Sequence, residues 1–246
     1  MLLFGADIFL IFFVVWSGIT TFWSYQNMKS VVAEIGSARV VGADVKDRNT
    51  PKPAITASVE SVKQESNYVY LITVSNQNAF WSSPSFSLHL SSGDNVSASR
   101  QSFLLPNEKR LVILTGDLGT TPTVSYDSFS WERTPPLSIP NIQIGTMQAQ
   151  HSFVTVTKQG VRRMVSQITS TVRNQSMYRV QTMKIIAVVR NGAQLVGVQQ
   201  VFIDDLRANE ERPVTIEFVE MLPAFTTIEL ATEIDALDPD TLQVDI

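Results

Sequence analysis

The stretch Ser85-Phe86-Ser87-Leu88-His89-Leu90 decides the fold class of this 246-residue chain. Phe86, Leu88 and Leu90 alternate with serine and histidine, so apolar side chains take one side of an extended backbone and polar ones the other. A period of two is typical of an antiparallel sheet with one buried face. Similar segments, rich in Val, Ile, Thr and Phe, predict further strands at Tyr68–Ser75, Leu111–Thr115, Ser152–Thr157, Met164–Val172, Lys184–Arg190, Val214–Phe218 and Phe225–Ile234.

An internal repeat surrounds this stretch. Ser75-Asn76-Gln77-Asn78 ends one predicted strand, and Arg173-Asn174-Gln175-Ser176 ends another 98 residues later. After each, the order of features is the same: an apolar strand, a glycine turn, a polar loop and a final apolar strand. The turns are at Gly93 and Gly192, and the loops are at residues 105–110 and 206–212. The ordered set of matches favours a tandem duplication.

The repeat predicts two β-sandwich domains, at residues 54–134 and 138–246. Each is near the size of an immunoglobulin-like sandwich of about 100 residues. The joint Thr134-Pro135-Pro136-Leu137-Ser138-Ile139-Pro140 favours an extended spacer, because proline fixes the backbone and cannot donate a hydrogen bond. The chain has no cysteine, so the disulfide of antibody domains is absent.

The segment from Ser170 to Phe218 resembles the FxLYD-type family of bacterial extracytoplasmic sandwich domains. In that family a strand ends in an asparagine turn, and a Gly hairpin, a long strand, an L-x-x-x-E loop and a closing strand follow. The namesake motif is absent, since Ile186-Ala187-Val188-Val189-Arg190 stands in its place. The resemblance implies a location in the bacterial envelope and no shared active site. The matching positions are Asn174, Gly192, Leu206 and Glu210.

The N-terminal region predicts a membrane anchor. Residues 2–23 form an apolar run with a single charge, Asp7, and a helix of this length covers a bilayer core of about 30 Å. The run exceeds the apolar region of a cleaved signal peptide, which is about 7–15 residues long. We expect a transmembrane helix at residues 1–24 and a stalk at residues 25–53. The flanking charges leave the orientation open, and we expect the C-terminal domains to be extracytoplasmic.

Composition excludes several classes of chemistry. Without cysteine there is no thiolate metal site or cysteine catalysis, and a net charge of −4 argues against nucleic-acid binding. His89 and His151 have no ligand-spaced partners in sequence, so they are predicted to be surface histidines. Asp235-Ala236-Leu237-Asp238-Pro239-Asp240 offers oxygens to calcium but lacks the Gly and terminal Glu of an EF-hand loop. We predict no enzyme, with no catalytic, cofactor-binding or metal residues and no cofactor.

Charge is unevenly distributed along the second predicted domain. Residues 137–203 contain seven bases and no acid, whereas residues 204–246 contain twelve acids and two arginines. In one interpretation, early and late strands are neighbours that pair their charges across a sheet. In the other, the domain has a basic face and an acidic face, suited to head-to-tail self-association or to a charged envelope polymer.

These features together predict an all-β protein with two tandem immunoglobulin-like β-sandwiches behind a single transmembrane α-helix. The predicted function is a non-catalytic, single-pass protein of the bacterial cell membrane that presents its sandwiches to other envelope proteins. One alternative is an accessory module that binds cell-wall glycan through Trp81 and Trp131. Another is a structural subunit of a secretion or surface-appendage assembly. The predicted partners are the bilayer, other envelope proteins and a second copy of the chain.

Overall fold

The computed structural model describes residues 50–93, 95–96, 99–127, 129–135, 138–158 and 160–244. The predicted transmembrane helix at residues 2–23 lies outside this part of the chain, as does most of the predicted stalk at residues 25–53. Among the described residues, no helix has the length and apolar content needed to cross a bilayer. The predicted division into domains at residues 54–134 and 138–246 stays a prediction.

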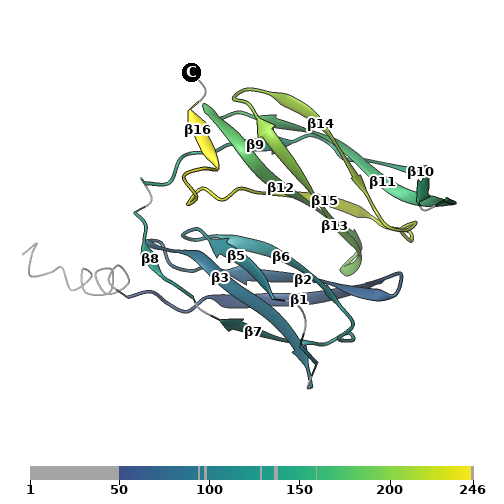
Figure 1. The fold of residues 1–246 in the computed structure, drawn as a ribbon, viewed down its shortest axis with the longest axis horizontal. Helices are drawn as coiled ribbons and strands as arrows, with labels where there is room; N and C mark the ends of the chain where they lie inside the picture. Colours follow the sequence, from purple (N-terminus) through teal and green to yellow (C-terminus); the bar gives the residue numbers. More distant parts are fainter. Residues whose placement is uncertain are drawn as a thin grey trace, which may run out of the picture. The chain divides into compact units, whose positions relative to one another are not determined.

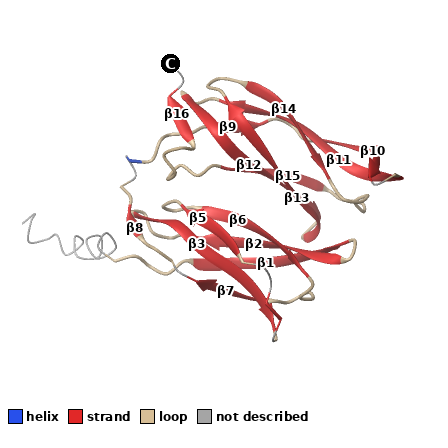
Figure 2. Cartoon of the chain, viewed as in Figure 1, coloured by secondary structure: helices blue, strands red, loops and turns tan. Residues whose placement is uncertain are grey.

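The described residues form sixteen strands in four antiparallel sheets, shown in Figures 1 and 2. Sheet I contains β1 (Ile55–Gln64), β2 (Asn67–Ser75) and β6 (Lys109–Gly116). Sheet II contains β3 (Trp81–Ser92), β4 (Asn95–Val96), β5 (Arg100–Leu104), β7 (Thr123–Asp127) and β8 (Glu132–Arg133). Sheet III contains β9 (Ile144–Thr146), β10 (Gln150–Lys158), β11 (Val161–Asn174) and β14 (Glu211–Glu217). Sheet IV contains β12 (Tyr178–Asn191), β13 (Gln194–Leu206), β15 (Thr227–Glu233) and β16 (Leu242–Val244).

The two halves of the described chain have the same strand topology. Sheet I has the order β1-β2-β6, and sheet III has the order β10-β11-β14. In sheet II, β3 pairs with β5, β7 and β8, and in sheet IV, β12 pairs with β13, β15 and β16. The registers also agree, since Leu71 lies opposite Ile113 in sheet I and Thr169 lies opposite Thr215 in sheet III. The repeat in the sequence is thus a repeat of strand topology.

Each pair of sheets encloses its own apolar core. Sheets I and II face each other across the first core, which contains Tyr70, Ile72, Phe86 and Leu88. Sheets III and IV enclose the second core around Ile185. The alternation in Ser85–Leu90 matches this arrangement, because Phe86, Leu88 and Leu90 are buried. The predicted all-β fold with β-sandwich architecture is therefore confirmed.

A third cluster, here called the junction core, lies between the two sandwiches. Val69, Leu71 and Ile113 of sheet I pack against residues of sheet IV on the side away from the first core. The sheet IV residues in this cluster are Ile186, Val188, Leu195 and Val198. Strands β2 and β12 are therefore apolar on both faces, which explains their nearly continuous apolar runs. The sheets stack in the order II, I, IV, III.

All eight predicted strand segments are present, and eight further strands were not among them. β2, β3, β6, β10, β11, β12, β14 and β15 contain or overlap the predicted segments. β1, β5 and β7 were not predicted, nor were the short strands β4, β8, β9 and β16, whereas β13 is the long strand that the family resemblance implies after the Gly hairpin. The first three carry few large apolar residues, because much of each strand faces solvent or lies at a sheet edge. The predicted turn at Gly192 is a β-hairpin turn: Asn191 pairs with Gln194, and Gly192 has a φ of 59°, a left-handed conformation that glycine adopts readily.

Candidate functional site

The Asn-Gln repeat marks a buried hydrogen-bond network in each sandwich. In the first, Asn76 Nδ2 donates to the carbonyl oxygens of Trp81 at 2.7 Å and Leu105 at 2.8 Å. Asn76 Oδ1 accepts the backbone N–H of Asn78 at 3.0 Å. One side chain thus joins the end of β2, the start of β3 and the loop before β6. Asn76 is 1% exposed, so loss of these bonds leaves buried backbone groups without partners.

Asn174 makes the corresponding bonds in the second sandwich. Its Nδ2 donates to Tyr178 O at 2.7 Å and Arg207 O at 2.9 Å, and its Oδ1 accepts the N–H of Ser176 at 3.0 Å. The Ser176 hydroxyl donates to the same oxygen at 2.7 Å, where Asn78 uses its side-chain amide in the first sandwich. The asparagines singled out by the repeat therefore fasten strand ends in both sandwiches.

The polar loops before β6 and β14 have equal geometry as well. Glu108 accepts the N–H of Leu105 at 2.6 Å, and Glu210 accepts the N–H of Arg207 at 2.8 Å. The preceding asparagine is left-handed in both loops. Burial alone raises the pKa of Glu210, but the bonds from Arg207 N–H and the Arg212 side chain lower it overall. These loops are structural, since each carboxylate closes its own turn.

The two repeats diverge at the arginine that follows the loop. Arg212 bonds to Glu210 and to the carbonyl oxygens of Asp204 and Asp205, so it stays within its own sandwich. Arg110 occupies the matching position in the first sandwich and is 2% exposed. It bonds to Glu108 at 2.5 Å and also approaches Glu233 of the other sandwich at 3.6 Å. The same position thus closes a loop in one repeat and bridges to the neighbouring sandwich in the other.

Glu233 is the centre of a buried charged cluster at the junction. Its carboxylate accepts the N–H of Leu111 at 3.1 Å and forms ion pairs with Arg110 and Lys184. The Arg110 guanidinium lies 3.3 Å from the ring centroid of Phe103, in a cation–π contact. The cluster joins β5 and β6 of the first sandwich to β12 and β15 of the second.

Burial governs the pKa shifts in this cluster. It raises the pKa of Glu108, against the charge of Arg110 and the hydrogen bond from Leu105. It lowers the pKa of Lys184, against the nearby carboxylate of Glu233. Both shifts disfavour charge in a poorly solvated setting. The cluster is therefore stable only while its positive and negative members remain paired.

Further polar contacts cross the junction away from this cluster. Arg190 on β12 forms a bidentate ion pair with Glu60 on β1, with 2.8 Å between Arg190 Nη2 and Glu60 Oε1. Arg163 pairs with Glu65 at 2.5 Å, and the buried Gln64 donates to Val198 O at 3.3 Å. Both arginines belong to the base-rich stretch at residues 137–203, and their acids come from the first sandwich.

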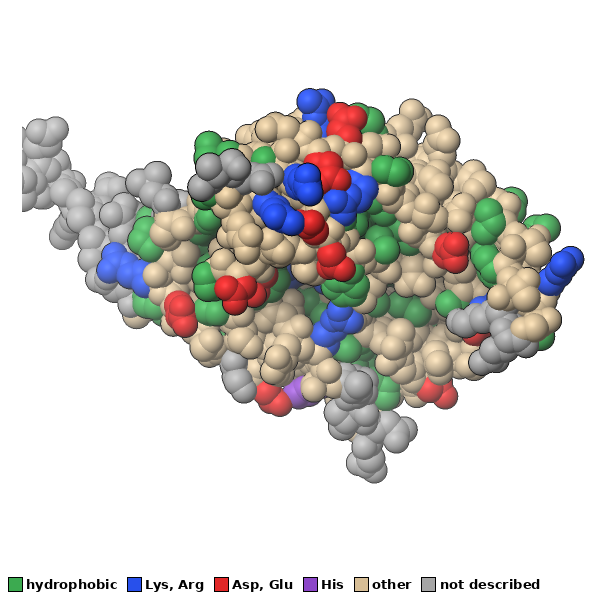
Figure 3. All heavy atoms as spheres, turned by 45° about the horizontal axis from the view of Figure 1, so that its top comes forward, with side chains coloured by type: hydrophobic (Ala, Val, Ile, Leu, Met, Phe, Trp, Pro, Cys, Tyr) green, Lys and Arg blue, Asp and Glu red, His purple; other side chains and the backbone are tan. Residues whose placement is uncertain are grey.

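The charge pattern of the second sandwich is thereby accounted for. Figure 3 shows Lys and Arg side chains beside Asp and Glu side chains on the face in view, rather than in separate patches. The pairing interpretation fits the contacts, and some acids of the first sandwich also take part. Within the second sandwich, the pairs between neighbouring strands are Arg173–Glu211, Arg179–Asp205 and Lys184–Glu233.

The two histidines of the sequence, which were predicted to lie at the surface, are on different sandwiches. His89, on the outer face of sheet II, has Nε2 3.3 Å from the Asp127 carboxylate, a partner on the neighbouring β7 that sequence spacing did not reveal. His151 Nε2 lies 3.0 Å from the hydroxyl of the fully buried Ser166, which also accepts the N–H of Leu222. These side chains are not brought together.

Trp81 and Trp131, the candidate glycan contacts, are both half-buried. Trp131 stacks on Phe129 with 5.5 Å between ring centroids, and Phe129 stacks on the buried Phe86 at 4.8 Å. In the acidic segment at residues 235–240, for which no metal was predicted, the side chains of Asp235 and Asp238 accept the N–H groups of Leu237 and Asp240 in local turns. Within the described chain, no cluster of three or more His, Cys, Asp or Glu residues is arranged to hold a metal.

Comparison with family models, curated proteins and solved structures found no match to this chain. The resemblance to FxLYD-type domains therefore stays a hypothesis based on the quoted residues. The function must be argued from the sequence and from the junction geometry.

Sequence reasoning missed the junction, although one signal for it was present. Aligned by topology, Val69 and Leu71 correspond to Gln167 and Thr169, which lie on the outer face of sheet III. The repeat was visible, so a comparison of the outward-facing positions would have shown which faces are apolar. On sheet IV, Ile186 and Val188 correspond to Ser87 and His89 of sheet II.

Proposed function

We propose that this chain is a non-catalytic, membrane-anchored protein of the bacterial cell envelope. In this proposal residues 2–23 span the membrane once, and residues 51–246 present two immunoglobulin-like sandwiches to other envelope proteins. The junction is the observation that carries the proposal. Its apolar core and paired charges make residues 51–246 one compact unit, as a protein used for positioning requires.

The junction supports a positioning role through rigidity. Two sandwiches on a flexible linker sample many relative orientations, and a partner that contacts both must restrict them at an entropic cost. The junction core and the Arg190–Glu60 and Arg110–Glu233 contacts remove most of that freedom before binding. A partner that spans both sandwiches therefore meets a preorganised surface.

The exposed faces indicate where such partners bind. The outer faces of sheets II and III carry polar side chains such as Ser87, Gln101, Gln167 and Thr169. Apolar side chains at the corresponding positions of sheets I and IV are buried in the junction core. We expect contacts with partners through polar faces and sheet edges, of the kind made in transient protein complexes.

Cysteine labelling on intact cells tests the anchor and its orientation, because the chain has no native cysteine. Ala193 lies at the exposed tip of the β12–β13 hairpin, whereas Ala187 is completely buried, and each is replaced by cysteine in a separate variant. With a membrane-impermeant maleimide, we expect Ala193→Cys to be labelled on intact cells and Ala187→Cys only after denaturation. Labelling of Ala193→Cys only after lysis would reverse the orientation, and recovery of the full chain in the soluble fraction would contradict the anchor.

Co-purification tests the interaction role. The full chain is extracted in mild detergent and its co-purifying proteins are identified, beside a variant with Leu71→Thr in the junction core. A defined set of proteins that is lost from the variant supports presentation by both sandwiches. A monomer without partners contradicts the proposal and directs attention to glycan binding.

A further inference from the structure

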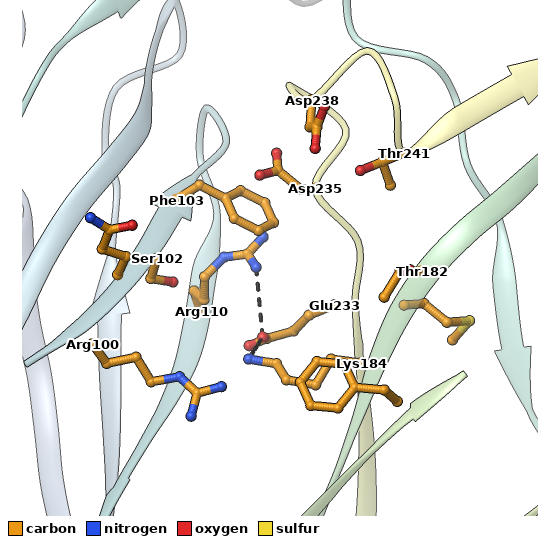
Figure 4. Close-up of a pocket in the computed structure, with 13 residues that line it drawn as sticks. Arg100, Ser102, Phe103, Arg110, Thr182, Lys184, Glu233, Asp235, Asp238 and Thr241 are labelled. Carbon is orange, nitrogen blue, oxygen red and sulfur yellow. Dashed lines mark ion pairs between the residues drawn. The ribbon is translucent and has the colours of Figure 1, made fainter. Parts of the chain in front are cut away.

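A cavity of about 300 Å³ lies beside the junction core, between the edge of β5 and the part of sheet IV that sheet I leaves uncovered (Figure 4). Its volume is at the lower end of the range for small-molecule sites, which is about 300–1,000 Å³. Residues of the first sandwich, including Arg100 and Phe103, form one wall. Thr182, Lys184 and Phe202 of sheet IV form the other.

Charges of opposite sign lie at opposite ends of this cavity. Figure 4 shows Asp235 and Asp238 together on the segment that follows β15, and Arg100 and Lys184 at the other end. Burial raises the pKa of Asp235, against a backbone hydrogen bond from Leu237 and the charge of Arg110. This carboxylate therefore lies where a positively charged guest would stabilise its ionised form.

Several charges of the lining are already paired, and others can still bind a guest. Glu233 forms ion pairs with Arg110 and Lys184, as described above. Arg100 forms no ion pair with another residue in the described part of the chain. Asp235 accepts backbone hydrogen bonds from Leu237 and Asp238, and Asp238 accepts one from Asp240. An ionised carboxylate has about four acceptor positions, so both keep capacity for a cation.

The middle of the cavity is aromatic. The Phe103 ring covers the Arg110 guanidinium, and Phe202 is 54% exposed although it lies on a sheet face next to buried residues. An exposed phenylalanine in a concave region favours contact with an apolar group of a ligand. The cavity thus combines a cationic end, an aromatic middle and an anionic end.

From this arrangement we propose that the cavity binds a short zwitterionic peptide, with its carboxylate at Arg100, its ammonium group at Asp235 and Asp238, and a side chain against Phe202. An isolated anion would meet the two aspartates, and an isolated cation would meet Arg100 and Lys184. A guest with both charges satisfies both ends. This inference is independent of the proposed anchor and envelope function.

Blocked dipeptides separate the contributions of the two ends. The full chain in detergent is titrated by calorimetry with alanyl-leucine, with its N-acetylated form and with its C-terminal amide. We expect binding of the free dipeptide and a loss of at least about tenfold in affinity for each blocked form, since each loses a charge-assisted contact. Absence of binding, or equal affinity for all three peptides, overturns the proposal. A loss on amidation alone overturns the zwitterion assignment, because a carboxylate would then suffice.

Matched variants locate the binding to this cavity. We expect Arg100→Gln and Asp238→Asn each to weaken alanyl-leucine binding at least about tenfold. Arg133→Gln and Asp240→Asn change exposed residues that do not line the cavity, and we expect no change in affinity from either. Equal effects in cavity and control variants overturn the proposal, and circular dichroism establishes that each variant is folded.

Discussion

Replacement of Leu71 by threonine tests whether the junction core holds the two sandwiches together. Leu71 is 1% exposed and contacts sheet IV through the junction core. Threonine is the residue found at the corresponding position of sheet III, Thr169. Leu71→Thr therefore places in sheet I the residue that sheet III has at the equivalent position, where it faces solvent.

The expected cost follows from burial. The substitution removes roughly two buried carbon groups, each worth about 0.8 kcal/mol. It also leaves a small void and buries a hydroxyl, which costs about 1–3 kcal/mol without a partner. We expect the free energy of unfolding to fall by about 3 kcal/mol, within the range for truncation of a buried leucine. The reverse change at the outer face of sheet III, Thr169→Leu, is expected to alter it by about 0.5 kcal/mol or less.

Urea unfolding with two probes distinguishes a coupled junction from a loose one. The chain has four tryptophans, of which Trp81 and Trp131 lie in the first sandwich. With Trp16 and Trp23 replaced by phenylalanine in every protein compared, fluorescence reports on the first sandwich, whereas far-ultraviolet circular dichroism reports on both. We expect the two transitions to coincide in the unchanged protein and to separate in Leu71→Thr. A cost below about 1 kcal/mol, or equal effects of Leu71→Thr and Thr169→Leu, would refute the reasoning.

Three further outcomes follow from the polar contacts. Asn174→Ala is expected to lower the free energy of unfolding by about 3 kcal/mol, because several buried hydrogen bonds are lost. Calorimetry measures this change, and Asn141→Ala, at an exposed asparagine, is a near-neutral control. Arg110→Met is expected to cost about 3–5 kcal/mol in urea unfolding, since it removes the ion pair of Glu108 and one of the two ion pairs of Glu233. A similar cost for Arg212→Met would contradict a special role at the junction. The folded state lowers the pKa of Glu210, so the stabilisation by this carboxylate is present above its unfolded pKa and is lost as pH falls through its folded pKa. Glu210→Gln should therefore destabilise at neutral pH and lose this effect in acid below the folded pKa, and an effect that stays constant from neutral pH into acid would exclude the linkage.

The sequence alone predicted the features that depend on neighbouring residues. The alternation in Ser85–Leu90 predicts a half-buried strand because successive side chains of an extended chain point to opposite faces. The Asn-Gln repeat and the following loops predict equivalent positions, and Asn76 and Asn174 do make equivalent hydrogen bonds. These features can be predicted from the sequence because strand period and turn chemistry are local properties.

Only the tertiary structure decided which outer faces meet and which charges pair across the junction. Val69 and Leu71 belong to an apolar run, but their burial depends on strand β12, more than 100 residues further along the chain. Arg110 and Arg212 have the same place in the repeat, and only the position of Glu233 makes one of them a bridge. Local pattern determines which side chains need burial, whereas the packing of distant strands determines what buries them.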